Sequence, residues 1–120
     1  DLPPIGPELA KANVEAGKAI FMKQCYTCHT VDKGGANKVG PNLWGIVGRK
    51  KASHEGFSYS SAMQAKGGEW TYEDINQLIY KPTAYVKGTK MAFAGLPKVQ
   101  ERADVIAYLR TMADSPQPLP

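Results

Sequence analysis

The stretch Cys25-Tyr26-Thr27-Cys28-His29 decides how this chain folds, because it uses both cysteines and one of the two histidines of the protein. Two thiols at this spacing can each form a thioether bond with a vinyl group on one edge of a porphyrin, and the histidine that follows can bind the iron. The pentapeptide therefore predicts one covalently attached c-type haem, held through Cys25 and Cys28, with His29 as an iron ligand.

Other uses of two closely spaced cysteines fit the sequence less well. A disulfide across two intervening residues is strained and closes a very short loop. A zinc site needs two further ligands, for which only His29 and His54 are available, and His29 lies directly beside Cys28. A thioredoxin-like redox pair belongs in a βαβ context, and the chain shows no alternating strand segments. Haem attachment is the favoured interpretation.

The composition is that of one ordinary globular domain. The chain has 120 residues, of which 42% are hydrophobic and 22% charged, with a formal net charge of +4. The 15 Lys and Arg residues are scattered rather than gathered in a basic stripe with aromatic residues. We therefore expect a monomer that binds no nucleic acid and meets an acidic protein partner. No apolar run approaches the roughly 18 residues that span a bilayer, but a chain beginning at Asp1 leaves room for a removed export signal or an upstream membrane tether.

Helical periodicity and capping residues predict an all-α fold of about four to five helices joined by long loops. The N-terminal prolines favour an extended arm, and Val99, Ile106 and Leu109 mark the inner face of the last helix. The expected elements are a Pro-rich arm over residues 1–12, a helix from Asn13 to the cysteine motif, a loop over 30–57, a short helix from Ser60 or Ser61 to Lys66, a helix from Thr71 to the residues before Pro82, a loop over 83–97, a helix over 99–113 and a Pro-rich tail over 114–120.

Two glycine positions indicate where the backbone approaches another group. Gly17 in mid-helix costs about 1 kcal/mol relative to Ala, so we expect another helix to pack closely there, with Phe21 one turn further on. In the long loop, the Gly40-Pro41 turn brings backbone close to a flat group. The Pro41 carbonyl could accept the ring N–H of His29, which would fix the tautomer of this iron ligand.

The second iron ligand has several candidates. Met22 and Met112 fall inside expected helices and read as core fillers, and Met63 lies in a short helix. His54 is the remaining histidine. Met91 lies in a loop between two glycines, where the backbone can approach a porphyrin, and a thioether ligand suits an electron carrier because it favours reduced iron. Met91 is therefore the best-placed candidate.

Several stretches outside the pentapeptide carry a family resemblance: Lys33-Gly34-Gly35, Gly40-Pro41-Asn42-Leu43, Gly48-Arg49, Gly56-Phe57-Ser58-Tyr59, Trp70, Pro82, Gly88-Thr89-Lys90-Met91 and Ile106-Ala107-Tyr108-Leu109. At these spacings the chain resembles a class I cytochrome c of the short mitochondrial and α-proteobacterial type. The resemblance implies a cytochrome c domain over residues 13–113, with crossing terminal helices and loops wrapped around the haem. The stretch from Lys87 to Pro97 most resembles the soluble domain of membrane-anchored bacterial cytochromes that donate to a terminal oxidase.

The resemblance also implies an activity and roles for individual residues. A protein of this family is a one-electron carrier and not an enzyme, with both axial positions of the iron filled. Its partners are a bc1-type donor and a cytochrome c oxidase acceptor, in the periplasm or the equivalent intermembrane space. The implied haem-binding residues are Cys25, Cys28, His29, Pro41 and Met91, with Arg49, Tyr59 and Trp70 at the inner propionate and Ser60 and Thr89 as further contacts.

The chain departs from the family pattern in ways that bear on the haem crevice. Met63 and Leu78 stand where the family often has Asn and Tyr, so we expect a drier crevice with Met ligation retained. Lys38, Lys90 and Lys98 match only part of the family's lysine ring, so we expect weak electrostatic steering. A haem peroxidase or ligand-binding cytochrome with an open iron is the alternative reading, and a zinc module without haem is the other.

Overall fold

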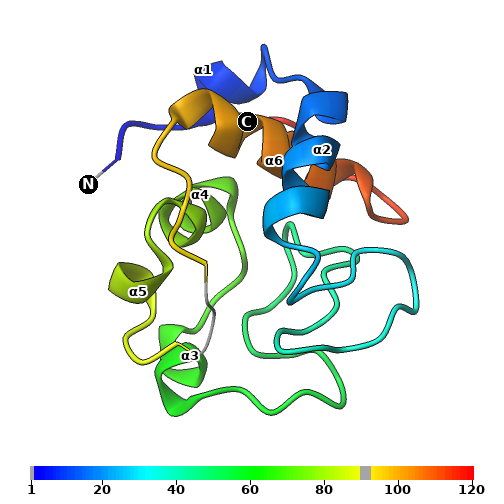
Figure 1. Ribbon diagram of the computed structural model, residues 1–120, viewed down its shortest axis with the longest axis vertical. Helices are drawn as coiled ribbons and strands as arrows, with labels where there is room; N and C mark the ends of the chain where they lie inside the picture. Colours follow the sequence, from blue (N-terminus) through cyan, green and yellow to red (C-terminus); the bar gives the residue numbers. More distant parts are fainter. Residues whose placement is uncertain (1, 90–92) are drawn as a thin grey trace.

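The fold is known from a computed structural model that describes residues 2–89 and 93–120 (Figure 1). Within these residues the regular elements are six α-helices and one isolated antiparallel bridge between Lys50 and Glu69. The all-α prediction is thus confirmed, with two more one-turn helices than the sequence pattern indicates. The helices are α1 (Gly6–Leu9), α2 (Val14–Gln24), α3 (Ser61–Lys66), α4 (Tyr72–Tyr80), α5 (Pro82–Tyr85) and α6 (Val99–Thr111).

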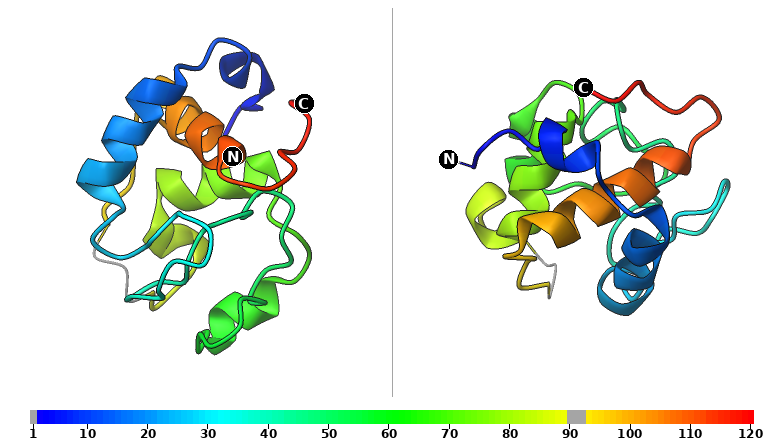
Figure 2. Two further views of the ribbon diagram at one scale, coloured as in Figure 1. Left: turned by 90° about the vertical axis from the view of Figure 1, so that its right-hand side faces the viewer. Right: turned by 90° about the horizontal axis from the view of Figure 1, so that it is seen from above.

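The crossing of α2 and α6 organises the fold, and both views of Figure 2 show it. Asn13 caps α2 by accepting the N–H of Ala16 at 2.9 Å. A Cβ atom on Gly17 would lie 1.8 Å from the backbone oxygen of Asp104. One turn later the rings of Phe21 and Tyr108 meet with centroids 5.7 Å apart. The predicted close approach at Gly17 is confirmed, and it places the C-terminal end of α2 against the core.

The N-terminal arm corrects the prediction of an extended segment. Pro7 lies in the first turn of α1, where its missing N–H costs no helical hydrogen bond. Ile5 and Leu9 are buried in the core, and the Ile5 N–H donates to both carboxylate oxygens of Glu73 at 3.0 and 3.2 Å. Proline therefore starts a helix here, and packing against α6 and α4 holds it in place.

Three further expectations differ from the structure. The loop after α4 begins with α5, again because Pro82 opens a helical turn. Val99 is 40% exposed, since it precedes the buried run of α6, which begins at Arg102. Met22 is 48% exposed and not a core filler, because it follows Phe21 and so lies about 100° around the helix from the inner face.

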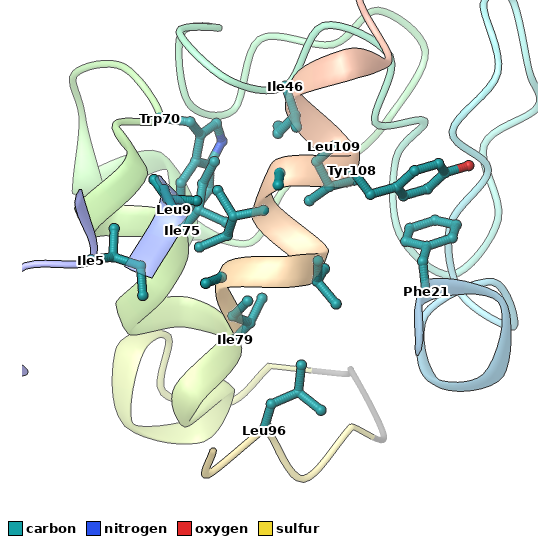
Figure 3. Packing of buried hydrophobic residues seen from close by; sticks show 14 of the residues in the cluster. Ile5, Leu9, Phe21, Ile46, Trp70, Ile75, Ile79, Leu96, Tyr108 and Leu109 are labelled. Carbon is teal, nitrogen blue, oxygen red and sulfur yellow. The ribbon is translucent and has the colours of Figure 1, made fainter. Parts of the chain in front are cut away.

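The core is built from α1, α2, α4, α6 and the loops between them (Figure 3). The predicted cap of α3 is confirmed, since the Ser60 hydroxyl accepts the N–H of Met63. Thr71 likewise caps α4 through the N–H of Asp74. The tail is exposed but tied to the domain, because the Gln117 carbonyl accepts from Arg110 Nε at 2.6 Å. No helix among the described residues is long and apolar enough to cross a membrane.

Candidate haem site

A cavity of about 560 Å³ opens between the C-terminal end of α2, the long loop, α4 and the segment before α6. Its walls are mostly apolar, and the polar groups among them are few. Among the residues that line it are Phe21, Cys25, Cys28, His29, Gly40, Pro41, Leu43, Ile46, Arg49, Tyr59, Ser60, Met63, Trp70, Leu78, Thr89, Phe93 and Leu109. The described site residues predicted from the sequence all lie on these walls.

The cysteine motif extends α2 into a tight turn. The Cys25 N–H donates to the Phe21 carbonyl at 2.8 Å, and the N–H groups of Cys28 and His29 both donate to the Cys25 carbonyl at 3.0 Å. Both thiols are free and partly buried at the cavity wall. Burial, and to a smaller extent the neighbouring Cys28, raises the pKa of Cys25 to about 11.

The imidazole of His29 is oriented by the backbone. Its Nδ1 lies 2.8 Å from the Pro41 carbonyl, and because a carbonyl only accepts, Nδ1 carries the proton. Burial lowers the pKa of His29 despite this hydrogen bond, and the charges of Arg49 and Lys38 lower it further. The ring is therefore neutral near pH 7, with the lone pair of Nε2 available for a metal. The predicted hydrogen bond to Pro41 is confirmed.

Gly40 holds the same ring from its edge. A Cβ atom at this position would lie 2.1 Å from Cε1 of His29 and 2.7 Å from either ring nitrogen. The Gly40 N–H also donates to the Cys28 carbonyl at 2.8 Å, which ties the loop to the cysteine motif. The close approach predicted from the Gly40-Pro41 pair is thus an approach to the histidine. Nothing local in the sequence links these residues, which are eleven positions apart.

A polar wall formed by Arg49, Tyr59 and Trp70 faces the cavity. Arg49 Nη1 donates to the Trp44 carbonyl at 3.2 Å, but its buried Nε has no hydrogen-bond partner among the described residues. Tyr59 accepts the N–H of His54 at 3.1 Å, so its own O–H remains a donor. A buried guanidinium with an unpaired N–H is costly, and an anionic group such as a haem propionate would relieve that cost.

The remaining predicted residues divide by position. Ser60 and Thr89 line the cavity. Met91 lies outside the described residues, although Thr89 and Phe93 on either side of it line the cavity. Met63 and Leu78 also line the cavity, where the family resemblance places them.

The residues present fit a covalently bound haem. The cavity combines apolar walls, two thiols on one turn, a neutral imidazole and the Arg49 guanidinium, whose buried Nε–H has no acceptor among the described residues. A haem would match all four: its flat ring the apolar walls, its vinyl groups the thiols, its iron the imidazole and its propionates the guanidinium. Fold and site together define the class of small all-α proteins that hold one haem between crossing terminal helices and wrapped loops.

Comparison with known proteins gives the family. The cytochrome c family profile matches residues 14–113. The chain is 51% identical over 118 residues to a cytochrome c homolog of Bradyrhizobium diazoefficiens, covering 98% of this chain and 64% of that protein. It is 48% identical over 106 residues to a cytochrome c homolog of Rickettsia bellii, covering 88% and 61%, and 44% identical over 110 residues to cytochrome c type-1 of Ascaris suum, covering 92% and 97%. This chain belongs to the cytochrome c family.

Membership in the family gives the cofactor. The family is one of haem-based electron carriers, and its haem c is attached covalently through cysteines, of which Cys25 and Cys28 are the two in this chain. The chain spans slightly less than two thirds of the length of the Bradyrhizobium and Rickettsia relatives.

Proposed function

We propose that this chain is a one-electron carrier that shuttles electrons from a bc1-type donor to a terminal oxidase in a respiratory or photosynthetic chain. The observation that carries the proposal is the neutral His29 imidazole, held by the Pro41 carbonyl at the wall of a mostly apolar cavity. A haem bound there supplies reversible one-electron chemistry at iron.

The residues of the chain would hold that group and exclude water from it. Cys25 and Cys28 would bond its edge, His29 would bind the iron, and Arg49, Tyr59 and Trp70 would hold a propionate, with Ser60 and Thr89 as further contacts. Leu78 and Met63 contribute apolar atoms to the walls. A rigid, dry environment of this kind reduces the solvent rearrangement that accompanies a change of charge at the iron.

Met91 is the proposed second iron ligand. The proposal is supported by its position in the sequence between Thr89 and Phe93, which both line the cavity. Met63 is the methionine of the described cavity wall and so is the competitor. If His29 and Met91 both hold the iron, a substrate would have to displace one of them to reach it, which favours electron transfer over catalysis.

The partner and compartment follow from the same proposal. Docking to acidic partner surfaces is supported by the net charge of +4. Lys38 keeps its charge for docking, because it is exposed and its ammonium contacts neutral groups, the Tyr26 ring at 3.6 Å and the Tyr26 carbonyl at 2.8 Å. We place the protein in the periplasm, with an inner-membrane anchor upstream of Asp1, where tethering to the membrane would replace steering by raising effective concentration.

Visible spectra of the haem-loaded protein test the proposal. We expect a six-coordinate low-spin spectrum in both redox states, an Fe–S(Met) charge-transfer band at neutral pH, and no change with carbon monoxide. Met91→Ala should lose the band and bind carbon monoxide, whereas Met63→Leu should do neither. Carbon monoxide binding by the unaltered protein would instead indicate an open-iron peroxidase or gas-binding protein, and loss of the band in Met63→Leu would reassign the ligand.

A further inference from the structure

We propose that Lys51 and Asp74 act as a positioning pair for the polar wall of the cavity, and that the ammonium of Lys51 keeps the haem propionate on that wall ionised. This inference rests on the proposed function, since it concerns a haem held by Arg49, Tyr59 and Trp70. Neither residue touches the haem site directly, and neither is a lining residue of the cavity.

The side chain of Lys51 is almost completely buried. It is 7% exposed, while that of its partner Asp74 is 35% exposed. The Lys51 ammonium donates to Oδ2 of Asp74 at 2.8 Å and lies 5.2 Å from the centre of the Trp70 ring and 5.9 Å from that of Tyr85. Lysine is rarely buried to this extent, because removing an ammonium from water is costly.

The ammonium nevertheless stays charged at neutral pH. Burial lowers the pKa of Lys51, but hydrogen bonds to Asp74 and Tyr85 outweigh this effect, so that the pKa is raised. The carboxylate of Asp74 is partly hydrated and therefore screened, whereas the ammonium is not. The pair consequently leaves a net positive field on the side that faces the interior.

Backbone hydrogen bonds fix Lys51 relative to the polar wall. The Trp70 N–H donates to the Arg49 carbonyl at 2.9 Å, and the Lys51 N–H donates to the Gly68 carbonyl at 2.9 Å. These bonds flank the bridge between Lys50 and Glu69. A short ladder thus links Lys51 to Arg49 and Trp70, two of the three residues of the polar wall.

The position of the charge has two consequences for a propionate. A cation near an indole ring withdraws electron density from it, which makes the Trp70 N–H a stronger donor. A positive charge in a poorly hydrated region also favours the ionised form of a nearby carboxyl group, whereas Asp74 disfavours it. Other ionisable groups around this wall are Arg49, His54, Tyr59, Lys66 and Tyr85, together with the exposed Lys50 and Glu69 of the bridge.

The test is the pH dependence of the reduction potential of the haem-loaded protein, which reports the pKa of the redox-linked propionate. Lys51→Met removes the cation with little change in side-chain volume, and the pKa of the propionate should rise by about one unit, a tenfold change in proton affinity. Asp74→Asn removes the opposing charge and should lower that pKa.

Lys66→Met is the matched control, because Lys66 also lies over the Tyr85 ring, at 4.2 Å, but is exposed. It makes the same change in net charge as Lys51→Met and should leave the propionate pKa where it is. Opposite shifts in Lys51→Met and Asp74→Asn separate an electrostatic role from a loss of packing, which would move both in one direction.

The proposal is overturned if Lys51→Met behaves like Lys66→Met, or if Asp74→Asn shifts the pKa upward. Should Lys51→Met not fold, the direction of the Asp74→Asn shift decides the matter. A protein without any reversible one-electron couple would overturn the proposed function itself, which is a different result from a couple whose pH dependence ignores Lys51.

Discussion

Gly40 illustrates how a single residue positions the proposed iron ligand, His29. A methyl group there would overlap the His29 ring, with Cβ 2.1 Å from Cε1. The adjacent Pro41 carbonyl holds Nδ1 of the same ring at 2.8 Å. Two consecutive backbone units therefore fix both the plane and the tautomer of the imidazole, and neither task uses a side-chain functional group.

Gly40→Ala should therefore weaken the site without removing any polar group. We expect a loss of about 1–3 kcal/mol in the free energy of unfolding of the haem-loaded protein, because the imidazole must move off its position. Denaturant unfolding followed by the haem absorbance measures this. The control is Gly6→Ala, whose new methyl group meets Pro120 at an ordinary 3.5 Å; equal stability of the two variants would contradict the steric argument.

Lys51 predicts a pH dependence of stability with a definite sign. Its pKa is raised by folding above the ordinary value of 10.5, against the effect of burial, by Asp74 and Tyr85. The stability it contributes is then complete below pH 10.5 and is lost as the pH rises through the folded-state value. The difference in unfolding free energy between the wild type and Lys51→Met should be constant from pH 7 to 9 and shrink above pH 10.5. A difference that grows with alkaline pH would refute the sign.

For single residues, the sequence predicts contacts that follow from the chemistry of a motif. It misses contacts between residues that only the folded chain brings together. The Pro41 carbonyl is a plausible partner for His29 because a metal-bound histidine needs an acceptor for its second ring nitrogen. Lys51, in contrast, looks like a surface residue in a Gly- and Lys-rich loop, since its partners Asp74 and Tyr85 are more than twenty residues away.

Among the helices, α2 shows most clearly how tertiary packing can override intrinsic helix propensity. Alanine is preferred to glycine inside a helix by about 1 kcal/mol, yet α2, which begins at Val14, contains Gly17. The backbone oxygen of Asp104 on α6 would lie 1.8 Å from a Cβ at this position. Backbone atoms cannot rotate out of the way, so contact between the two helices requires glycine.

Gly17→Ala should thus destabilise the protein despite its better helix propensity. Overpacking of this kind typically costs about 1–3 kcal/mol, and we expect a net loss of about 2 kcal/mol measured by denaturant unfolding. Lys18→Ala, at the next and exposed position of α2, should change stability by less than about 0.5 kcal/mol. A variant at Gly17 as stable as the one at Lys18 would show that the helices separate without cost.

Of the four helices that the sequence predicts, α6 has no side-chain cap and is recognised by its periodic apolar face. The other three have local start signals. Asn13, Ser60 and Thr71 each accept a backbone N–H within the first turn, which is visible as a capping residue before a periodic segment. The one-turn helices α1 and α5 lack side-chain caps and are held by tertiary contacts. A helix of four residues is unstable alone, so its presence depends on packing that no local pattern encodes.

At the scale of the whole molecule, the haem cavity occupies part of the interior that side chains do not fill. It has a volume of about 560 Å³ and mostly apolar walls, and covering apolar surface with a bound group is favourable. The walls come from α2, the long loop, α4 and the segment before α6, so little of the fold is independent of the haem.

A chain without haem should therefore lose its fixed tertiary structure. The double variant Cys25→Ala and Cys28→Ala, purified without haem, should show weak near-ultraviolet circular dichroism and no cooperative thermal transition. The haem-loaded wild type is the control and should show both. A sharp unfolding transition in the haem-free variant would mean that the protein core suffices by itself.

The buried thiol of Cys25 has a consequence for how the protein is assembled in the cell. With a pKa of about 11, only about one Cys25 side chain in ten thousand is a thiolate at pH 7, and the thiolate is the reactive form. Burial in the fold therefore opposes the reaction of this thiol with a vinyl group. We expect the thioether bonds to form on an open chain, before the haem completes the fold.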